Sequence, residues 1–250
     1  MEKEDEFIRR LEDLSGRAAS RSVVTHTQFL TPAEQYRLSK WLQGRADVQC
    51  VTGCGVEGCE RNAAFFLPGW MDPADLDYSE YIGAVIIKAG FGEPGHRDYM
   101  GSILGLGIKR EWLGDIIIDG STASVLSMNP VSETLVSELT HVSRYGVRVR
   151  KAELSEIKPP EKKTKEMTFT VVSPRFDAVL SGVFGISRTL AEKQIRAGLA
   201  SLNYEICMKP DAEVREGAVI SLKGKGKAVM KEAGGKSRKG RTVLTFSKYV

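Results

Sequence analysis

The chain has 250 residues, of which 42% are hydrophobic and 27% are charged, and its formal net charge is +4. This composition is that of a globular protein with room for two or three domains, and it excludes a disordered or collagen-like chain. No segment approaches the about 20 apolar residues that span a membrane, and the acidic N-terminus lacks the apolar stretch of a signal peptide. We therefore expect a cytoplasmic protein that has no membrane partner.

The charges are distributed unevenly along the chain. Residues 151–250 contain 20 Lys and Arg against 11 Asp and Glu, a net charge of +9. Residues 1–150 contain 16 against 21, a net charge of −5. A basic C-terminal part predicts a polyanionic partner for that part, and the alternative is an ordinary solvated surface.

The N-terminal part of the chain is predicted to be a small α+β unit. Apolar residues at helical spacing indicate a helix over residues 2–19. Thr31 is typical of a helix N-cap and Pro32 of a first helical residue, so a second helix is expected to start there. Short strands are expected at residues 47–52 and 63–67.

The central part alternates strands and helices in the order β-α-β-β-α-β. This order is that of the split-βαβ plait of RRM-like and ferredoxin-like domains. Such a plait often presents its open sheet face to RNA. The expected strands cover residues 81–88, 115–119, 123–128 and 147–154, and the expected helices cover residues 97–108 and 130–142.

A linker rich in proline and charge, at residues 157–168, precedes a third unit. Two short helices are expected there, at residues 175–180 and 187–197, and Gly198 is typical of the residue that closes a helix. The expected strands cover residues 169–173, 199–206, 219–223 and 241–246.

The third unit contains a specific series of motifs. Arg175-Phe176-Asp177 is followed by Ser187-Arg188, by a helix that ends at Gly198, and by a β segment after Gly217. This order closely resembles the RNA-binding domain named after ribosomal protein S-four. The predicted fold class is therefore α+β, with an N-terminal α+β unit (residues 1–75), a central plait (76–156), a linker (157–168) and an S-four-type αβ domain with a basic tail (169–250).

The candidate RNA-binding residues of this domain surround its second helix. Ser187 is a good N-cap, and a helix N-terminus with Arg188 in its first turn favours a phosphate. Asp177 is expected to be structural, because a carboxylate repels phosphate. The candidates are Arg175, Ser187, Arg188, Lys193, Arg196, Lys223, Lys225, Lys227, Lys236, Arg238 and Lys239, and Arg241 belongs to the same basic tail.

Two expectations about these cations can be checked directly. Strand alternation through Lys223-Gly224-Lys225-Gly226-Lys227 is expected to place the three lysines on one side. Arg188, Arg196 and Lys225 are expected to form one continuous surface without acidic partners. The alternative for Arg175 is that it pairs with Asp177 or Glu192 and only supports the fold.

A second series of motifs lies in the central part: Gly95-His96-Arg97-Asp98, Lys109-Arg110-Glu111 and Gly114-Asp115-Ile116. Together with the third unit, these motifs resemble the YlmH family of bacterial RNA-binding proteins. The resemblance implies association with the large ribosomal subunit, at obstructed particles that hold peptidyl-tRNA. We expect Arg97, Lys109 and Arg110 to contact RNA, with Glu111 orienting Arg110, and His96 and Asp98 to cap the helix of Arg97.

The predicted function is that of a non-catalytic, monomeric protein of ribosome-associated quality control. Its expected partners are rRNA of the large subunit and tRNA or peptidyl-tRNA. The alternatives are an RNA-modifying enzyme of the pseudouridine-synthase type, a tyrosyl-tRNA synthetase fragment and a cell-division-linked interaction protein. His96 beside Asp98 would be the acid–base pair of an enzyme, but neighbours at a helix start do not face each other.

No cofactor or metal is predicted. Cys50, Cys54 and Cys59 are spaced by four and five residues, which is not the paired C-x-x-C spacing of a zinc site. They are expected to be reduced thiols in a glycine-rich loop.

Overall fold

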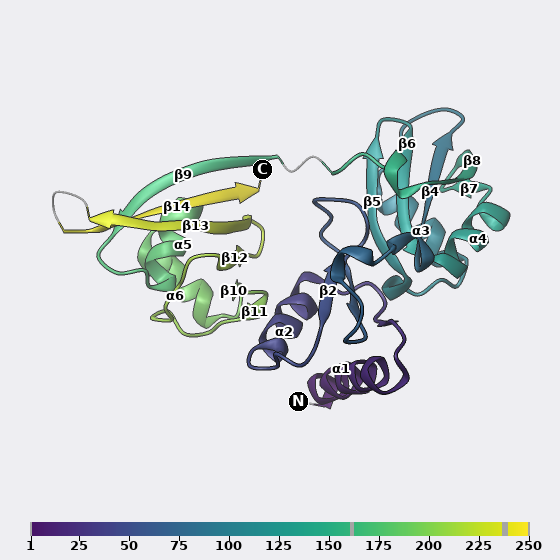
Figure 1. Ribbon diagram of the computed structural model, residues 1–250. Helices are drawn as coiled ribbons and strands as arrows, with labels where there is room; N and C mark the ends of the chain where they lie inside the picture. The colour runs from purple at the N-terminus through teal and green to yellow at the C-terminus, as the bar shows by residue number, and fades with distance from the viewer. Residues whose placement is uncertain (1, 161–162, 237–239, 250) are drawn as a thin grey trace. The chain divides into compact units, whose positions relative to one another are not determined.

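The computed structural model describes residues 2–160, 163–236 and 240–249, which form two compact units, Met1–Pro160 and Glu161–Val250 (Figure 1). The units combine helices with antiparallel sheets, so the α+β class is confirmed. Arg238 and Lys239 lie outside the described residues, as does the side chain of Lys236. In the part of the chain that is described, no helix is both long and apolar enough to cross a membrane.

The first unit begins with two helices, α1 (Glu2–Arg21) and α2 (Pro32–Leu42). Both were predicted. The start of α2 is fixed by a capping box, in which Glu34 N donates to Thr31 Oγ1 at 3.3 Å and Thr31 N donates to Glu34 Oε2 at 2.7 Å. The box satisfies backbone donors that a helix N-terminus otherwise leaves unpaired.

A small antiparallel sheet follows, in the order β1 (Thr25–His26), β3 (Ala63–Phe66), β2 (Cys50–Gly53). The central strand β3 is buried on both faces. Ala64 and Phe66 pack against Leu11 of α1 and Leu38 of α2, whereas Phe65 points to the opposite side. This double burial explains why the strand is apolar at every position.

The predicted plait is present, with strand order β5-β6-β4-β8 and a short β7 beside β8. All neighbouring strands are antiparallel. The predicted helix over 130–142 ends early, because its last residues form a hairpin with β8. The elements are β4 (Ile82–Ala89), α3 (His96–Gly105), β5 (Leu113–Asp119), β6 (Thr122–Met128), α4 (Asn129–Glu138), β7 (His141–Val142) and β8 (Tyr145–Ala152), with short 3-10 helices at Pro73–Asp75, Tyr78–Glu80, Arg110–Trp112 and Leu154–Glu156.

The two faces of the plait are covered by different parts of the first unit. On one face, Val85 and Val125 share a buried cluster with Ile103 of α3 and Leu135 of α4. On the other face, much of the sheet is packed against the small N-terminal sheet. The middle of the sheet face that was expected to meet RNA, at Ala84 and Leu126, is therefore buried.

That burial is built from a few small and apolar side chains. Ala84 of β4 and Leu126 of β6 lie in one buried cluster with Ala63 and Phe65 of β3. Because this cluster joins residues 1–75 to residues 76–156, the two segments share a core within the first unit.

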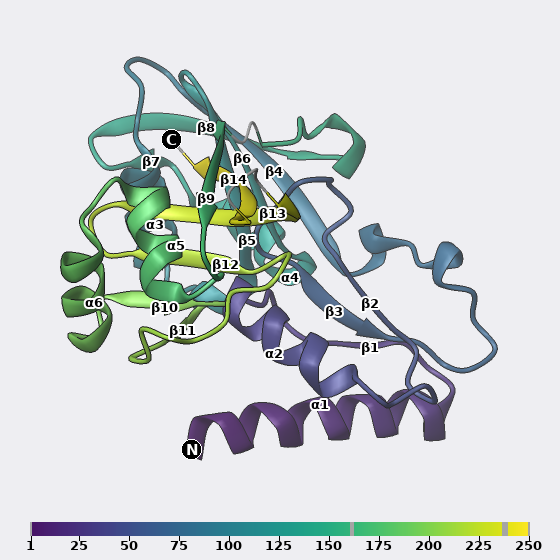
Figure 2. The same cartoon turned by 90° about the vertical axis from the view of Figure 1, so that its left-hand side faces the viewer.

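The second unit is a six-stranded sheet with two helices on one face (Figures 1 and 2). Its core is formed by the apolar sides of α5 and α6 and the inner side of the sheet, with Phe176, Ile195 and Phe246 fully buried. The elements are β9 (Thr164–Val171), α5 (Phe176–Phe184), α6 (Arg188–Arg196), β10 (Ala200–Leu202), β11 (Glu205–Ile206), β12 (Val219–Leu222), β13 (Gly226–Lys236) and β14 (Thr242–Tyr249), in the sheet order β11-β10-β12-β13-β14-β9.

Three features of this unit differ from the prediction. Strand β9 begins at Thr164, inside the predicted linker, because Thr164–Val171 pairs along its whole length with β14. The predicted strand over 199–206 is a hairpin instead, with positive φ at Asn203 (51°) and Tyr204 (68°). Strand β13 was not predicted, because its sequence is rich in lysine and glycine.

Candidate nucleic-acid interface

The helices α5 and α6 place the basic side chains of the second unit. Gly185 closes α5 in the left-handed conformation (φ 61°), which lets the chain turn directly into α6. Ser187 caps α6 as predicted, because its Oγ accepts the N–H of Leu190 at 3.2 Å. Ala191 and Ile195 bury one side of α6, so its basic residues lie on the remaining surface.

A buried carboxylate organises two of the predicted arginines. The side chain of Asp177 is 4% exposed. It accepts Arg175 Nε at 3.3 Å, Arg188 Nε at 3.1 Å and Arg188 Nη2 at 2.9 Å, and also the backbone N–H of Ala178 at 2.7 Å. Asp177 therefore fixes both guanidinium groups beside the N-terminus of α6.

The ionisation of Asp177 depends on these arginines. Burial by itself would raise the pKa of Asp177, but the hydrogen bonds from Arg175 and Arg188 outweigh burial and lower the pKa below its ordinary value. The carboxylate therefore stays charged at neutral pH. It neutralises only one of the two guanidinium charges, and the side chains of Arg175 and Arg188 remain 44% and 58% exposed.

The other basic residues of α6 continue along the helix. Arg188, Glu192 and Arg196 are four residues apart and share one stripe. Arg196 Nη2 donates to Glu192 Oε1 at 2.9 Å. Lys193 is exposed next to this stripe. The basic side of α6 thus extends from its first residue to its last.

The expectation that Arg188 and Arg196 have no acidic partners is wrong. The physical reason differs between them. Arg188 shares a buried acid with Arg175, which leaves a surplus positive charge. Arg196 makes an exposed pair within one helix, with the side chains 66% and 46% exposed, and such a pair contributes only about 0.3–0.5 kcal/mol. A phosphate can therefore compete with Glu192 for Arg196, and it can bind the exposed parts of Arg175 and Arg188 without displacing Asp177.

Lys223 and Lys225 lie in the hairpin turn after β12 and Lys227 lies on β13, so the three lysines do not alternate along one strand. Gly224 (φ 79°) and Gly226 (φ 95°) have positive φ and reverse the chain between β12 and β13. The predicted alternation is therefore wrong. Lys223 and Lys225 are exposed in the turn, whereas Lys227 lies on β13 with its Nζ 4.4 Å from the centre of the Tyr249 ring.

This turn lies next to the C-terminal end of α6. The backbone N–H of Lys223 donates to Leu199 O at 2.9 Å, and Leu199 lies three residues after Arg196, the last residue of α6. We refer to six residues at the N-terminus of α6, along α6 and in this turn as the basic track: Arg175, Arg188, Lys193, Arg196, Lys223 and Lys225.

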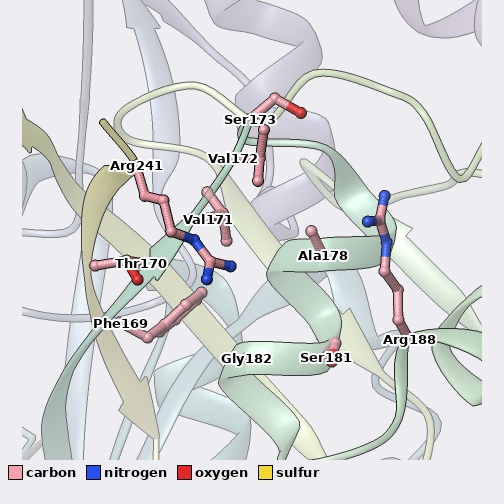
Figure 3. A pocket seen from close by; sticks show the side chains of 10 residues that line it. All are labelled: Phe169, Thr170, Val171, Val172, Ser173, Ala178, Ser181, Gly182, Arg188 and Arg241. Carbon is pink, nitrogen blue, oxygen red and sulfur yellow. The ribbon is translucent and has the colours of Figure 1, made fainter. Parts of the chain in front are cut away.

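A pocket of about 280 Å³ opens beside the N-terminal end of this track. Figure 3 shows Arg241 and Phe169 on its strand side and Ala178 and Arg188 on its helix side. The guanidinium groups at this pocket suit a phosphate, which accepts their hydrogen bonds. The ring of Phe169 is already stacked on Phe246, with the ring centres 5.7 Å apart. The sequence analysis assigned Arg241 to the basic tail, but no sequence signal indicated that Arg241 lines the same pocket as Arg188.

The predicted RNA-binding residues of the central plait differ in exposure and in hydrogen-bond partners. Arg97 and Lys109 are exposed. Arg110 is not oriented by Glu111; its Nη1 donates to Leu113 O at 2.7 Å and Gly114 O at 3.1 Å. Burial, together with the nearby Arg61, lowers the pKa of Arg110 to about 10. Arg110 therefore supports the start of β5.

Asp98, Cys54 and Cys59, which could have contributed to an acid–base or metal site, are engaged in the fold. Asp98 Oδ2 accepts the N–H of Gly95 at 2.8 Å, so it caps α3 as predicted, while His96 is exposed. Cys54 and Cys59 are buried in the core of the first unit. Over residues 2–160, 163–236 and 240–249, no three His, Cys, Asp or Glu side chains gather closely enough to bind a metal.

Comparisons with known proteins agree with the motifs. Residues 73–156 match the family described as "Putative RNA-binding domain in YlmH". Over 222 residues the chain is 28% identical to "Ribosome-associated protein quality control protein P2" of Bacillus subtilis, which covers 89% of this chain and 86% of the relative. The resemblance to the YlmH family is confirmed.

The part that matches the YlmH domain contains the whole plait, from β4 to β8. A solved structure, "Cell division protein ylmH from Streptococcus pneumoniae", is also similar, with a TM-score of 0.49 and 21% identity over 62% of this chain and 90% of that one. The YlmH-type plait and the basic track of the second unit are thus separate candidate sites for RNA on one chain.

Proposed function

We propose that the chain is a non-catalytic RNA-binding protein that associates with rRNA of the large ribosomal subunit and acts in quality control of stalled peptidyl-tRNA complexes. The observation that carries the proposal is the pair of arginines held by the buried Asp177 at the N-terminus of α6. The ribosome-associated relative and the RNA-binding family of the plait support the same function.

The arginine pair suits a phosphate for two reasons. A helix N-terminus attracts anions through its free N–H groups and its dipole. Arg175 and Arg188 reach the same place with their orientation already fixed by Asp177, so less side-chain entropy is lost when a phosphate binds. Contacts of this kind fix position on an RNA backbone and do not read its sequence.

A binding role without catalysis is supported by the structural role of Asp98, which belongs to the one acid–base pair that the sequence analysis considered. The only histidine–aspartate neighbours of the predicted motifs are His96 and Asp98, and Asp98 is occupied as the cap of α3. tRNA or peptidyl-tRNA is proposed as the second partner, because a quality-control factor that holds a stalled complex must contact it. A loss of rRNA modification on deletion of the gene would instead favour the enzyme alternative.

The proposal is tested by sedimentation of the purified chain with large ribosomal subunits. The double substitution Lys193→Glu and Lys225→Glu reverses two exposed charges of the basic track and leaves the Asp177 contacts intact. Each lost phosphate contact is expected to cost about 1.4 kcal/mol, which is tenfold in affinity. The salt dependence of binding should also become shallower, by about 0.7–0.9 in slope per contact.

The matched control is Arg10→Glu, which reverses an exposed charge on α1, outside the basic track. It should leave sedimentation with the subunits unchanged. Arg188→Gln should weaken binding without adding a negative charge beside Asp177. The proposal fails if the wild-type chain stays in the supernatant, or if the double variant sediments as well as the Arg10→Glu control.

A further inference from the structure

Two cysteines of the first unit have no part in the proposed function. Cys54 and Cys59 are 1% and 8% exposed, and both lie in the core cluster that joins the small sheet to the plait. Both are free thiols. A buried thiol in apolar surroundings is ordinarily inert, so its immediate neighbours decide whether it can react.

The turn between β2 and β3 brings these two thiols together. Gly55 (φ 76°) and Gly58 (φ 79°) have positive φ and reverse the chain between the two cysteines. A hydrogen bond joins the side chains of Cys54 and Cys59. The two sulfur atoms are therefore already in contact in the folded chain.

The third cysteine of this region, Cys50, lies apart from the pair. It packs against the cluster of Leu11 and Leu38, on the opposite side of the small sheet from Cys54 and Cys59. Along the sequence, Cys54 is four residues from Cys50 and five residues from Cys59. Sequence spacing alone therefore does not favour the pair of Cys54 with Cys59, and the fold selects it.

The contact makes the two thiols chemically unequal. The hydrogen bond from Cys59 lowers the pKa of Cys54 against the effect of burial, whereas the bond to Cys54, together with burial, raises the pKa of Cys59. Burial raises the pKa of Cys50 to about 12. Because the thiolate is the form that attacks an oxidant, Cys54 is the favoured nucleophile, and Cys59 is placed to react with it next.

One end of the turn is anchored, and its middle is open to solvent. Asp115 Oδ2, on β5, accepts the N–H of Glu60 at 2.6 Å, which fixes the chain directly after Cys59. Gly55 and Gly58 are exposed, and neither carries a side chain. A small oxidant can therefore reach the thiols when the middle of the turn opens, without unfolding of the core around them.

We propose that Cys54 and Cys59 are an oxidation site, at which hydrogen peroxide converts the two thiols to an intramolecular disulfide. The Cys54 thiolate attacks one peroxide oxygen, so that an S–O bond forms, the O–O bond breaks, and the other oxygen leaves as water with the proton that Cys54 released. The Cys59 sulfur then attacks the Cys54 sulfur, so that the S–S bond forms and the S–O bond breaks. The hydroxyl leaves as a second water with the Cys59 proton. The two sulfurs are oxidised and the peroxide is reduced.

The test uses the full chain, which is treated with hydrogen peroxide and then unfolded and labelled with iodoacetamide. Cleavage after Arg45 and Arg61 releases residues 46–61, which contain Cys50, Cys54 and Cys59. Mass spectrometry should find three labels on this peptide before oxidation. After oxidation it should find one label, on Cys50, and a pair of unlabelled cysteines lighter by two hydrogen atoms. This mapping of the wild-type chain does not depend on the folding of any variant.

Cys50→Ser is the matched control and should leave formation of the disulfide unchanged. Cys59→Ser should stop at the Cys54 sulfenic acid, which dimedone traps. In urea, the preference for the pair of Cys54 with Cys59 over the pair of Cys50 with Cys54 should be lost.

The inference is overturned if Cys54 and Cys59 keep their labels at peroxide concentrations that oxidise free glutathione. It is also overturned if a disulfide between Cys50 and Cys54 is the main product of the folded chain, or if the same preference persists in urea, because the fold would then not select the pair.

Discussion

At the scale of single residues, Asp177 determines the most about the candidate site, because it binds both Arg175 and Arg188. Sequence reasoning assigned it a structural role, because a carboxylate repels phosphate, and the structure shows it buried beneath Arg175 and Arg188. The same contact that supports the fold also aligns the two cations. The pairing of Arg175 with Asp177, weighed as the purely structural alternative, is therefore present and remains compatible with a phosphate site.

Substituting Asp177→Asn should destabilise the second unit by roughly 1.5–3 kcal/mol at pH 7, because it removes hydrogen bonds that involve charged groups. The pKa of Asp177 is lowered in the folded state, so the unfolded state binds the extra proton first as the pH falls. The stabilisation is thus present above about pH 4, the ordinary pKa of Asp, and is lost below it. Urea unfolding followed by circular dichroism between pH 3 and pH 7 should show a smaller wild-type advantage at the acid end.

The prediction is contradicted if the wild-type chain and the Asp177→Asn variant differ by the same free energy of unfolding at both ends of this pH range. The pH dependence would then come from other carboxylates, and the depressed pKa of Asp177 would not contribute to stability.

At the scale of elements, two glycines inside helices differ in whether replacement by Ala is expected to stabilise the fold. Packing against a neighbouring strand can outweigh the higher helix propensity of Ala. Ala normally stabilises a helix interior by about 1 kcal/mol relative to Gly. At Gly101 in α3 a Cβ would meet nothing within 4 Å, whereas at Gly182 in α5 it would lie 2.3 Å from the ring of Phe169. Gly182 is therefore needed for the close approach of β9 to α5.

Gly101→Ala is expected to stabilise the first unit by about 0.5–1 kcal/mol. Gly182→Ala is expected to destabilise the second unit, because forcing the Phe169 ring aside costs about 1–3 kcal/mol and exceeds the helix gain. Urea unfolding of the wild type and of both variants measures the free energy of unfolding, which should rise for Gly101→Ala and fall for Gly182→Ala. A stabilised Gly182→Ala variant would show that the ring moves at little cost.

Elements were predicted well where their signals are local. The capping box at Thr31, the N-cap at Ser187 and the strand order of the plait follow from patterns within a few residues or from element order. Strand β13 was missed because its lysines and glycines have low β propensity, although it pairs with β14, the next strand along the chain.

At the scale of the whole molecule, the chain consists of two compact units with separate cores. All three tryptophans, Trp41, Trp70 and Trp112, lie in the first unit. Tryptophan fluorescence therefore reports the unfolding of that unit, while circular dichroism reports both. We expect Asp177→Asn to shift only the part of the circular dichroism transition that belongs to the second unit.

A shift of the tryptophan transition by the same substitution would show that the two units unfold together. Gly101→Ala is the reciprocal control. It lies in the first unit and should move the tryptophan fluorescence transition to a higher urea concentration.

The sequence by itself determined the α+β class, the plait order, the capping residues and the location of the positive charge, because these follow from periodicity, local hydrogen bonds and composition. Only the tertiary structure decided that Asp177 holds two arginines, that Arg110 serves the backbone of β5, and that the N-terminal sheet buries much of the plait's face. The buried sheet face joins side chains from distant parts of the chain. The partners of Asp177 and Arg110 are near in sequence, but burial and side-chain orientation, which no local pattern shows, select them. Burial and partners decide whether a charge or a sheet face stays available to a ligand.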